Sequence, residues 1–243
     1  MKELDDFEDG LIERFRQHPV LRDIDRLSED AFHDILLQRR FLSHTFTTVY
    51  DLAIDLLTDE QAIRIARVII REEYPDDKSS GPPPSHREDM KCDILRLGVS
   101  WRKFVETRPS RETGEVISHM FSLLADSGAG EHANMKLVTI LRFWGEILVS
   151  VEYAELWRRM EKHLMVNGEN HSLFYYPHLK HDAKTRPLAE ASPLSLTHSD
   201  QLGVRLYQLV GSAPDTWDSF REVESTVLGL KNRFYDQFVP AIP

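Results

Sequence analysis

Apolar residues recur every three or four positions along almost the whole chain of 243 residues, and this period is the feature that most constrains the fold. Between residues 4 and 17 the apolar positions are Leu4, Phe7, Leu11, Ile12 and Phe15. Such spacing is typical of an amphipathic helix that buries one face. No stretch shows the sustained alternation, bounded by turn residues, that a β-strand requires. We therefore predict an all-α fold, with residues 1–243 in a single domain of seven to nine helices.

The composition excludes several classes of protein. Lys and Arg total 30 against 40 Asp and Glu, a net charge of −10, which disfavours binding to nucleic acid or to an anionic membrane. Because Cys92 is the single cysteine, the chain alone cannot form an intramolecular disulfide, a Cys-rich zinc site or an iron–sulfur cluster. The acidic N-terminal residues do not resemble a signal peptide, and no run of about 18 apolar residues could span a bilayer. We expect a cytoplasmic protein, with a homodimer as the default assembly.

The most hydrophobic predicted helix, residues 133–164, contains an acidic residue in an unusual place. From Leu137 to Val151 nearly every position around Glu146 is apolar, so this helix is expected to be buried on most sides. A buried carboxylate is costly unless it has a partner. Two partners are open at this point: a metal ion, or Arg142 one turn earlier on the same helix.

A second polar pair lies on a predicted helix that follows Leu173. His178 and Asp182 are four residues apart and therefore share one helix face, and His181 lies between them. An imidazole and a carboxylate that project together suit Fe(II), Mn(II) or Zn(II). The alternative is a solvated polar face without a ligand.

Acidic residues and a histidine also flank the most obvious loop. Glu72 and Glu73 end an apolar helix, residues 76–84 contain three prolines and a glycine, and His86 begins the next helix just after the capping residue Ser85. An acid and a histidine at these two helix ends could point into one cleft. The alternative is that the two acids form an exposed helix end.

Taken in order, these motifs resemble the haem-oxygenase-like diiron oxidases and oxygenases, over a stretch from about Leu11 to Phe238. The residues that carry the resemblance are Ile70-Arg71-Glu72-Glu73-Tyr74 with Ser85-His86, Phe143-Trp144-Gly145-Glu146-Ile147, and Tyr175-Tyr176-Pro177-His178-Leu179-Lys180-His181-Asp182. In this family three histidines and three carboxylates hold two irons within a seven-helix bundle. The resemblance implies the same bundle here.

Five ligands follow from the resemblance by position. They are Glu72, His86, Glu146, His178 and Asp182. Since the loop after Glu72 is longer than is usual in the family, Glu73 is an alternative first carboxylate.

The sixth ligand departs from the family pattern. The family places a histidine about one turn after the aspartate, where this chain has Thr185 and Arg186. We interpret residues 183–197 as an insertion and His198, at the start of the next helix, as the displaced ligand. His181 is the alternative, and a surface histidine at a helix cap is the simplest reading of His198. If neither histidine serves, the second metal site is incomplete.

The resemblance implies a function as well as a fold. It indicates a non-haem diiron oxidase or oxygenase with two irons per chain and O2 as co-substrate, acting through a peroxo-diiron(III) species. The expected partner is a small metabolite derived from an amino acid or a fatty acid. Other readings of the same fold stay open. They are a metal-free enzyme with Cys92 as nucleophile, a haem-handling enzyme with His18, His33 or His44 as the haem ligand, and a non-catalytic helical interaction module with a degenerate metal site.

Overall fold

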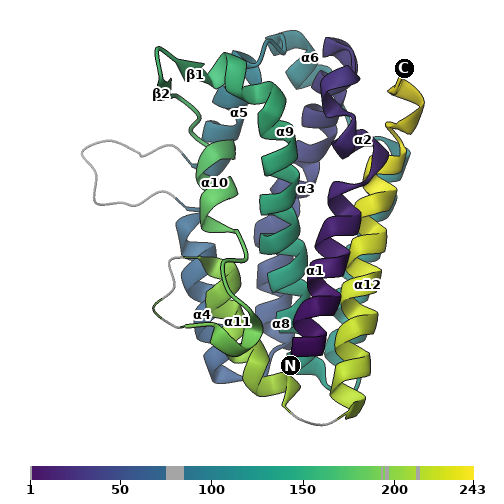
Figure 1. The fold of residues 1–243 in the computed structure, drawn as a ribbon, viewed down its shortest axis with the longest axis vertical. Coiled ribbons are helices and arrows are strands. Elements are labelled where there is room, and N and C mark those ends of the chain that lie inside the picture. The colour runs from purple at the N-terminus through teal and green to yellow at the C-terminus, as the bar shows by residue number, and fades with distance from the viewer. Residues whose placement is uncertain (1, 75–84, 193, 195–196, 212–213) are drawn as a thin grey trace.

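Long helices carry most of the chain and run along the long axis of the molecule (Figure 1). The computed structural model describes residues 2–74, 85–192, 194, 197–211 and 214–243. The helices are α1 (Lys2–Arg16), α2 (Pro19–Arg22), α3 (Glu29–Leu56), α4 (Glu60–Glu72), α5 (His86–Arg96), α6 (Trp101–Glu106), α7 (Arg111–Ala129), α8 (Ala133–Ile140), α9 (Leu148–Leu164), α10 (Tyr175–His181), α11 (His198–Val210) and α12 (Pro214–Asp236). Short 3₁₀ turns cover Ile24–Arg26, Leu188–Glu190 and Val239–Ala241. The predicted all-α class is confirmed.

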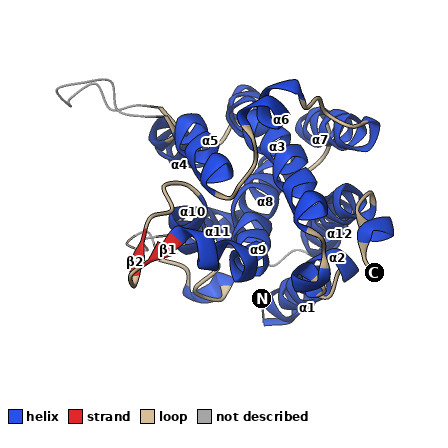
Figure 2. Cartoon of the chain, turned by 90° about the horizontal axis from the view of Figure 1, so that it is seen from above, coloured by secondary structure: helices blue, strands red, loops and turns tan. Residues whose placement is uncertain are grey.

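The apolar stripes of these helices meet in one continuous core. Seen end-on in Figure 2, α8 and α9 lie among the surrounding helices, and α9 packs against α1, α5 and α10. Phe15 of α1, Leu156 of α9 and Phe234 of α12 are all fully buried in this core. Burial of each such side chain stabilises the fold by about 1.5–3 kcal/mol. The helical period of the sequence therefore indicates which face of each helix is buried.

The helix predicted over residues 133–164 is continuous but not uniform. Its middle segment, Leu141–Ile147, is wound as a π-helix that joins α8 to α9. A π-turn displaces one residue from the regular α-helical ladder, and such turns often occur at functional sites. Gly145 lies in this segment, where an added Cβ would lie 3.3 Å from Cε2 of Tyr50 and 3.4 Å from Cε2 of Phe46. The missing side chain therefore lets α3 approach the π-helical segment closely.

A small hairpin was not predicted. Strands β1 (Met165–Val166) and β2 (Glu169–Asn170) pair antiparallel after α9. The turn between them is Asn167-Gly168, and both residues have positive φ, 52° and 83°. This dipeptide is the strongest short-range signal for a tight hairpin, and it is visible in the sequence. The flanking strands were missed because they are only two residues long.

Two predicted connecting segments differ in how much of them is described. The loop at residues 76–84 lies outside the described residues, as do residues 193, 195 and 196 of the stretch 183–197. The rest of that stretch is irregular apart from one 3₁₀ turn. That it is an insertion, and that the chain is a single domain, stay predictions.

Asp93 of α5 fixes the start of the short helix α10. Its carboxylate is fully buried and accepts hydrogen bonds from the hydroxyl of Ser172 (2.7 Å) and from the backbone N–H groups of Leu173 (3.0 Å) and Phe174 (2.9 Å). Backbone N–H groups at a helix start have no partner within the helix, so this side chain satisfies them from outside. It thereby joins α5 to α10, two helices that both carry predicted site residues.

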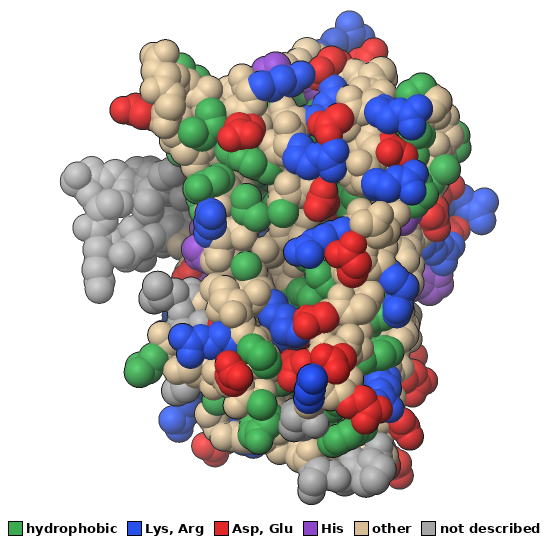
Figure 3. Space-filling model, in the orientation of Figure 1, with side chains coloured by type: hydrophobic (Ala, Val, Ile, Leu, Met, Phe, Trp, Pro, Cys, Tyr) green, Lys and Arg blue, Asp and Glu red, His purple; other side chains and the backbone are tan. Residues whose placement is uncertain are grey.

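The surface carries both signs of charge. On the face drawn in Figure 3, basic and acidic side chains alternate over the helices, and basic groups do not gather into one patch. Within the part of the chain that the structure describes, no helix has both the length and the apolar composition needed to cross a bilayer.

We expect Asp93→Ala to lower the free energy of unfolding by about 2–3 kcal/mol, because it leaves several buried N–H groups without an acceptor. Chemical denaturation followed by circular dichroism measures this change. Asp51→Ala, which removes an exposed carboxylate from α3, is the matched control and should have little effect. Equal stability of the two variants would contradict the capping role of Asp93.

Candidate metal centre

One cavity of about 420 Å³ is lined by every candidate metal ligand that the sequence analysis named. These residues come from the end of α4, from α5, from the π-helical segment, from α10 and its C-terminal end, and from the start of α11. They are Glu72, Glu73, His86, Glu146, His178, His181, Asp182 and His198. Segments separated by more than a hundred residues therefore direct carboxylate and imidazole groups into a common space.

Glu73, His86 and His178 form the first group within this cavity. Oε1 of Glu73 lies 3.1 Å from Nδ1 of His86 and 3.9 Å from Nε2 of His178. Burial opposes ionisation of Glu73, but its contacts with the two histidines hold the pKa of its carboxyl at about 2. The same contact with Glu73 outweighs burial and raises the pKa of His86. Each residue offers one ligand atom, and these atoms lie within 4.8 Å of one another.

The two histidines of the first group are held differently. Nδ1 of His178 donates a hydrogen bond to the backbone carbonyl of Phe174 (2.7 Å), so the other ring nitrogen, Nε2, is left to face Glu73. Such a backbone contact is the usual means of orienting a metal-binding imidazole. Nδ1 of His86 is buried and makes no aligned hydrogen bond with any described residue, although Glu73 is close.

Glu146, Asp182 and His198 form the second group. Nδ1 of His198 lies 3.3 Å from Oε2 of Glu146 and 3.8 Å from Oδ1 of Asp182. The other carboxylate oxygen of Glu146 accepts a hydrogen bond from the hydroxyl of Tyr50. Glu146 and Asp182 are both buried, at 1% and 3% exposure. The structure therefore places two carboxylates side by side away from water.

This crowding changes the proton affinities of the second group. Burial, together with the negative charge of Glu146, raises the pKa of the Asp182 carboxyl well above its usual value. Burial alone would lower the pKa of His198, but the contacts with Glu146 and Glu72 raise it to about 9. Burial and the nearby Glu146 charge also raise the pKa of Tyr50, so its hydroxyl keeps its proton and acts as a donor.

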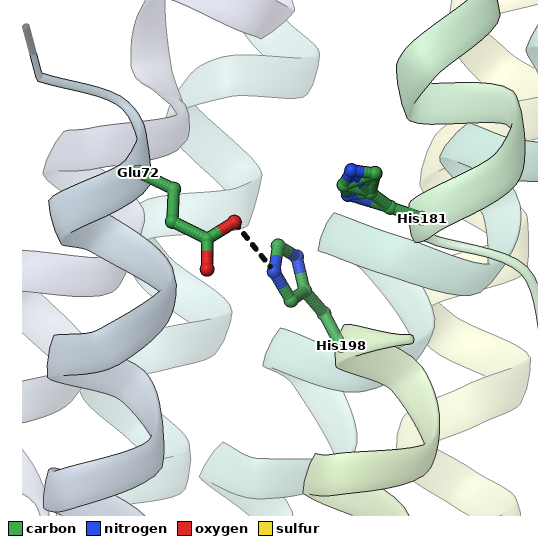
Figure 4. Close-up of side chains that lie close together, drawn as sticks. All are labelled: Glu72, His181 and His198. Carbon is green, nitrogen blue, oxygen red and sulfur yellow. Dashed lines mark hydrogen bonds and ion pairs between the residues drawn. The ribbon is translucent and has the colours of Figure 1, made fainter. Parts of the chain in front are cut away.

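A third group shares His198 with the second. Glu72 and His198 point toward one another from α4 and α11, and His181 of α10 lies near His198 (Figure 4). Oε2 of Glu72 is 3.1 Å from Nε2 of His198, and the rings of His181 and His198 are 5.3 Å apart. The side chain of Glu72 is 49% exposed, against 17% for Glu73. Glu72 thus lies at the outer edge of the cavity.

The geometry distinguishes between the alternatives for the first carboxylate. Glu73, rather than Glu72, lies with His86 and His178, whereas Glu72 lies with His181 and His198. Adjacent residues on a helix point about 100° apart, so only one of the two can face a given group.

His198 reaches the cavity because the ends of the stretch 183–197 are joined. The hydroxyl of Ser199 donates to the backbone carbonyl of Ala183 (2.7 Å), and Asp200 accepts hydrogen bonds from the backbone N–H and hydroxyl of Thr185. This brings the start of α11 next to the end of α10. His198 therefore lies beside Asp182, although the turn directly after Asp182 contains Thr185 and Arg186 and no histidine.

The alternative partner for Glu146 was wrong. Arg142 pairs with Glu8 of α1 instead, and its Nη2 lies 3.1 Å from Oε1 of that residue. Its Nε also donates to the backbone carbonyl of Ser199 (3.0 Å). Arg142 therefore links the π-helical segment to α1 and to the start of α11.

Sequence reasoning did not identify four buried polar residues in or beside this cavity. Tyr50 supports Glu146, while Arg39 and Lys231 line the cavity and share the buried carboxylate of Glu152. Each lies within an apolar helical stripe, and a polar residue in that position is the signal that could have identified it.

Comparison with known proteins places the fold. No known family matches the sequence, and no curated protein matches it. Solved structures do match. A domain of unknown function with a heme oxygenase-like fold from Shewanella denitrificans is 14% identical, with a TM-score of 0.68 over 98% of this chain and 90% of that one.

Two further structures agree with this match. A CADD-like protein of unknown function from Nostoc punctiforme is 14% identical, with a TM-score of 0.66 over all of both chains. A TenA family transcription regulator from a Silicibacter species is 11% identical, with a TM-score of 0.57 over all of this chain and 96% of that one. Since the identities are low, these similarities establish the architecture alone. The resemblance predicted from the sequence motifs is confirmed at that level: this chain adopts the heme oxygenase-like fold.

Proposed function

We propose that this protein is a non-haem diiron oxidase or oxygenase that uses O2 to oxidise a small metabolite derived from an amino acid or a fatty acid. One observation carries the proposal: carboxylate and imidazole groups from five separate segments converge, in adjacent groups, within one cavity of about 420 Å³. Mixed carboxylate and imidazole ligands suit first-row divalent metals such as iron. A cavity of this size is typical of a small-molecule site.

Two features of these side chains fit the binding of two cations. Nδ1 of His86 is buried without an aligned hydrogen bond among the described residues, as expected of a nitrogen whose partner is a metal. Glu146 and Asp182 are buried together, and the raised pKa of Asp182 records the cost of that arrangement. A cation between the two carboxylates would remove this cost. Glu73, His86 and His178 would hold one iron, and Glu146, Asp182 and His198 the other.

Bound iron would supply the electrons and the open positions at which O2 and substrate meet. The chain itself supplies orientation and shelter. Tyr50 fixes the carboxylate of Glu146, and the Phe174 carbonyl fixes the ring of His178. Trp144 and Val149 line the cavity beside these groups, and their apolar side chains would limit the access of water to the reacting atoms.

The competing enzyme readings are less well supported. Cys92 is not among the residues that line the cavity. Nor are the candidate haem ligands. His18 bonds with Asp236, and His33 contacts the backbone carbonyl of Leu97. An interaction module would need none of the buried ligand groups described above.

Anaerobic addition of Fe(II) tests the proposal directly. We expect about two irons per chain, in keeping with the two ligand groups, and a transient visible absorption after rapid mixing with O2. Iron is counted by a chelator assay and the transient by stopped-flow spectroscopy. Absence of bound iron, or iron that does not react with O2, would refute the proposal.

Substitution separates the two metal positions. His178→Ala removes a ligand from the first group and His198→Ala from the second, so each variant should retain about one iron per chain. His163→Ala, at an exposed position of α9, is the control and should keep the wild-type content. If both site variants load iron as the wild type does, the assignment of these groups is wrong.

The two adjacent glutamates should differ in their effect. Because Glu73 lies with His86 and His178, Glu73→Gln should weaken iron binding about tenfold or more, whereas Glu72→Gln should have the smaller effect. Competition for iron with a chelator of known affinity measures both. A larger loss in the Glu72 variant would restore the assignment made from the sequence.

Metal binding should be linked to pH. Because the pKa of His198 is about 9 in the metal-free chain, its imidazole must lose a proton before it can bind a metal. Between about pH 6 and pH 8 the affinity for Co(II), an optical probe, should therefore increase at least about tenfold per pH unit. His198→Ala should show a shallower dependence. An affinity that does not change over this range would contradict the mechanism.

A further inference from the structure

We infer that Arg39 and Lys231 form a binding site for a carboxylate group of the substrate, at the part of the cavity beside Trp144 and Tyr153. The inference rests on the proposed function, because it assigns a substrate class to the same cavity. It makes the substrate an organic acid whose apolar body extends from this site toward the candidate metal ligands.

Arg39 and Lys231 converge on one buried carboxylate. Nε and Nη2 of Arg39 on α3 lie 2.9 and 2.8 Å from Oε2 of Glu152 on α9, and Nζ of Lys231 on α12 lies 2.8 Å from the same oxygen. The three residues are between 0% and 3% exposed. Both cationic side chains nevertheless line the cavity.

The cluster contains more positive than negative charge. Arg39 and Lys231 carry one positive charge each when protonated, and Glu152 supplies one negative charge. Neutral hydroxyls lie beside them. Ser43 accepts a hydrogen bond from Arg39 (2.9 Å), Tyr153 lies next to Ser43, and Tyr235 lies close to Glu152. A surplus buried positive charge is costly unless an anion neutralises it.

Lys231 is protonated less readily than an exposed lysine. Burial lowers the pKa of its ammonium group to about 7, with Glu152 opposing the change and Arg39 adding to it. Its Nζ also lies 4.6 Å from the centre of the Trp144 ring, a cation–π contact. An arriving carboxylate would supply the missing negative charge and favour the protonated lysine.

Both side chains have donors left for such a ligand. A guanidinium has five N–H donors and an ammonium three. Among the described residues, Arg39 directs its donors to Glu152 and Ser43, and Lys231 directs one to Glu152. The remaining N–H groups match the two oxygens of a carboxylate, which a planar guanidinium binds well. A surplus of one charge suits a monoanion.

The distance between the Arg39–Lys231 site and the candidate metal ligands indicates how long the ligand should be. Glu152 follows Glu146 by six residues on a continuous helix, a rise of about 9 Å. Tyr153 lies between the two regions, because its ring centre is 5.1 Å from Cζ of Arg39 and 6.3 Å from the ring centre of His178. Apolar side chains line the cavity alongside, including Leu42, Phe46 and Val149. A carboxylate held at one end would therefore place an apolar chain beside the candidate ligands.

Octanoate and octan-1-ol test the inference without any substitution. They share a chain length and differ in charge, and calorimetric titration of the metal-free full chain measures binding of each. We expect octanoate to bind at least about tenfold more tightly than the alcohol. Equal affinities, or no binding of octanoate, would overturn the inference.

Lys231→Met tests whether Lys231 is responsible for the tighter binding of octanoate. This variant removes the surplus charge and leaves the Arg39–Glu152 pair intact, so octanoate should bind about tenfold more weakly while octan-1-ol is unaffected. Lys162→Met, an exposed lysine of α9, is the matched control. Wild-type octanoate binding by a folded Lys231→Met protein would overturn the inference. If this variant fails to fold, the comparison of the two ligands on the wild-type chain decides.

The outcome is separable from that of the proposed function. Octanoate binding is measured without metal, whereas the proposed function depends on the iron count and on reaction with O2. Selective octanoate binding by a chain that loads no iron would support the acid site and refute the diiron oxidase. Two irons that react with O2, without tighter binding of octanoate than of octan-1-ol, would support the diiron oxidase and refute the acid site.

Discussion

The rest of the site depends on a carboxylate buried in the most apolar helix of the protein. Glu146 is 1% exposed, and it is surrounded by partners rather than by water: the Tyr50 hydroxyl donates to one oxygen, and His198 lies 3.3 Å from the other. An isolated charge in that position would destabilise the fold by several kcal/mol. The helix containing it therefore requires α3 and α11 to lie where they do. The π-helical winding and the missing side chain of Gly145 allow α3 to approach closely enough.

Positioning of the histidines depends on contacts outside the cavity. Asp93 holds the start of α10 through its backbone N–H groups, and Arg142 holds the start of α11 through the carbonyl of Ser199. Neither residue lines the cavity. Both act on backbone groups, so they fix where a helix begins and hence where its ligands project. The candidate ligands can consequently be assembled before any metal is bound, which reduces the free-energy cost of ordering them on binding.

Much of this site could be predicted from the sequence because its residues interrupt helical patterns. Glu146 interrupts an apolar helix, and His178 and Asp182 share a face by their spacing. The choice between adjacent residues could not be predicted, since which of Glu72 and Glu73 points inward depends on how α4 is rotated by packing. The pairing of Lys231 with Glu152 was equally inaccessible, because the two are separated by 79 residues and meet only through the fold.

The same continuous helix also explains why ion pairs and candidate ligands alternate along it. Arg142 precedes Glu146 by four residues and pairs with Glu8 of α1, while Glu152 follows it by six and binds Arg39 and Lys231 of α3 and α12. Breaking a buried pair leaves an uncompensated charge, so each pair resists displacement of the helices it joins. Ion pairs on both sides of Glu146 therefore restrain the cavity wall along its length. A wall restrained in this way can keep its shape while the candidate ligands exchange protons for metal.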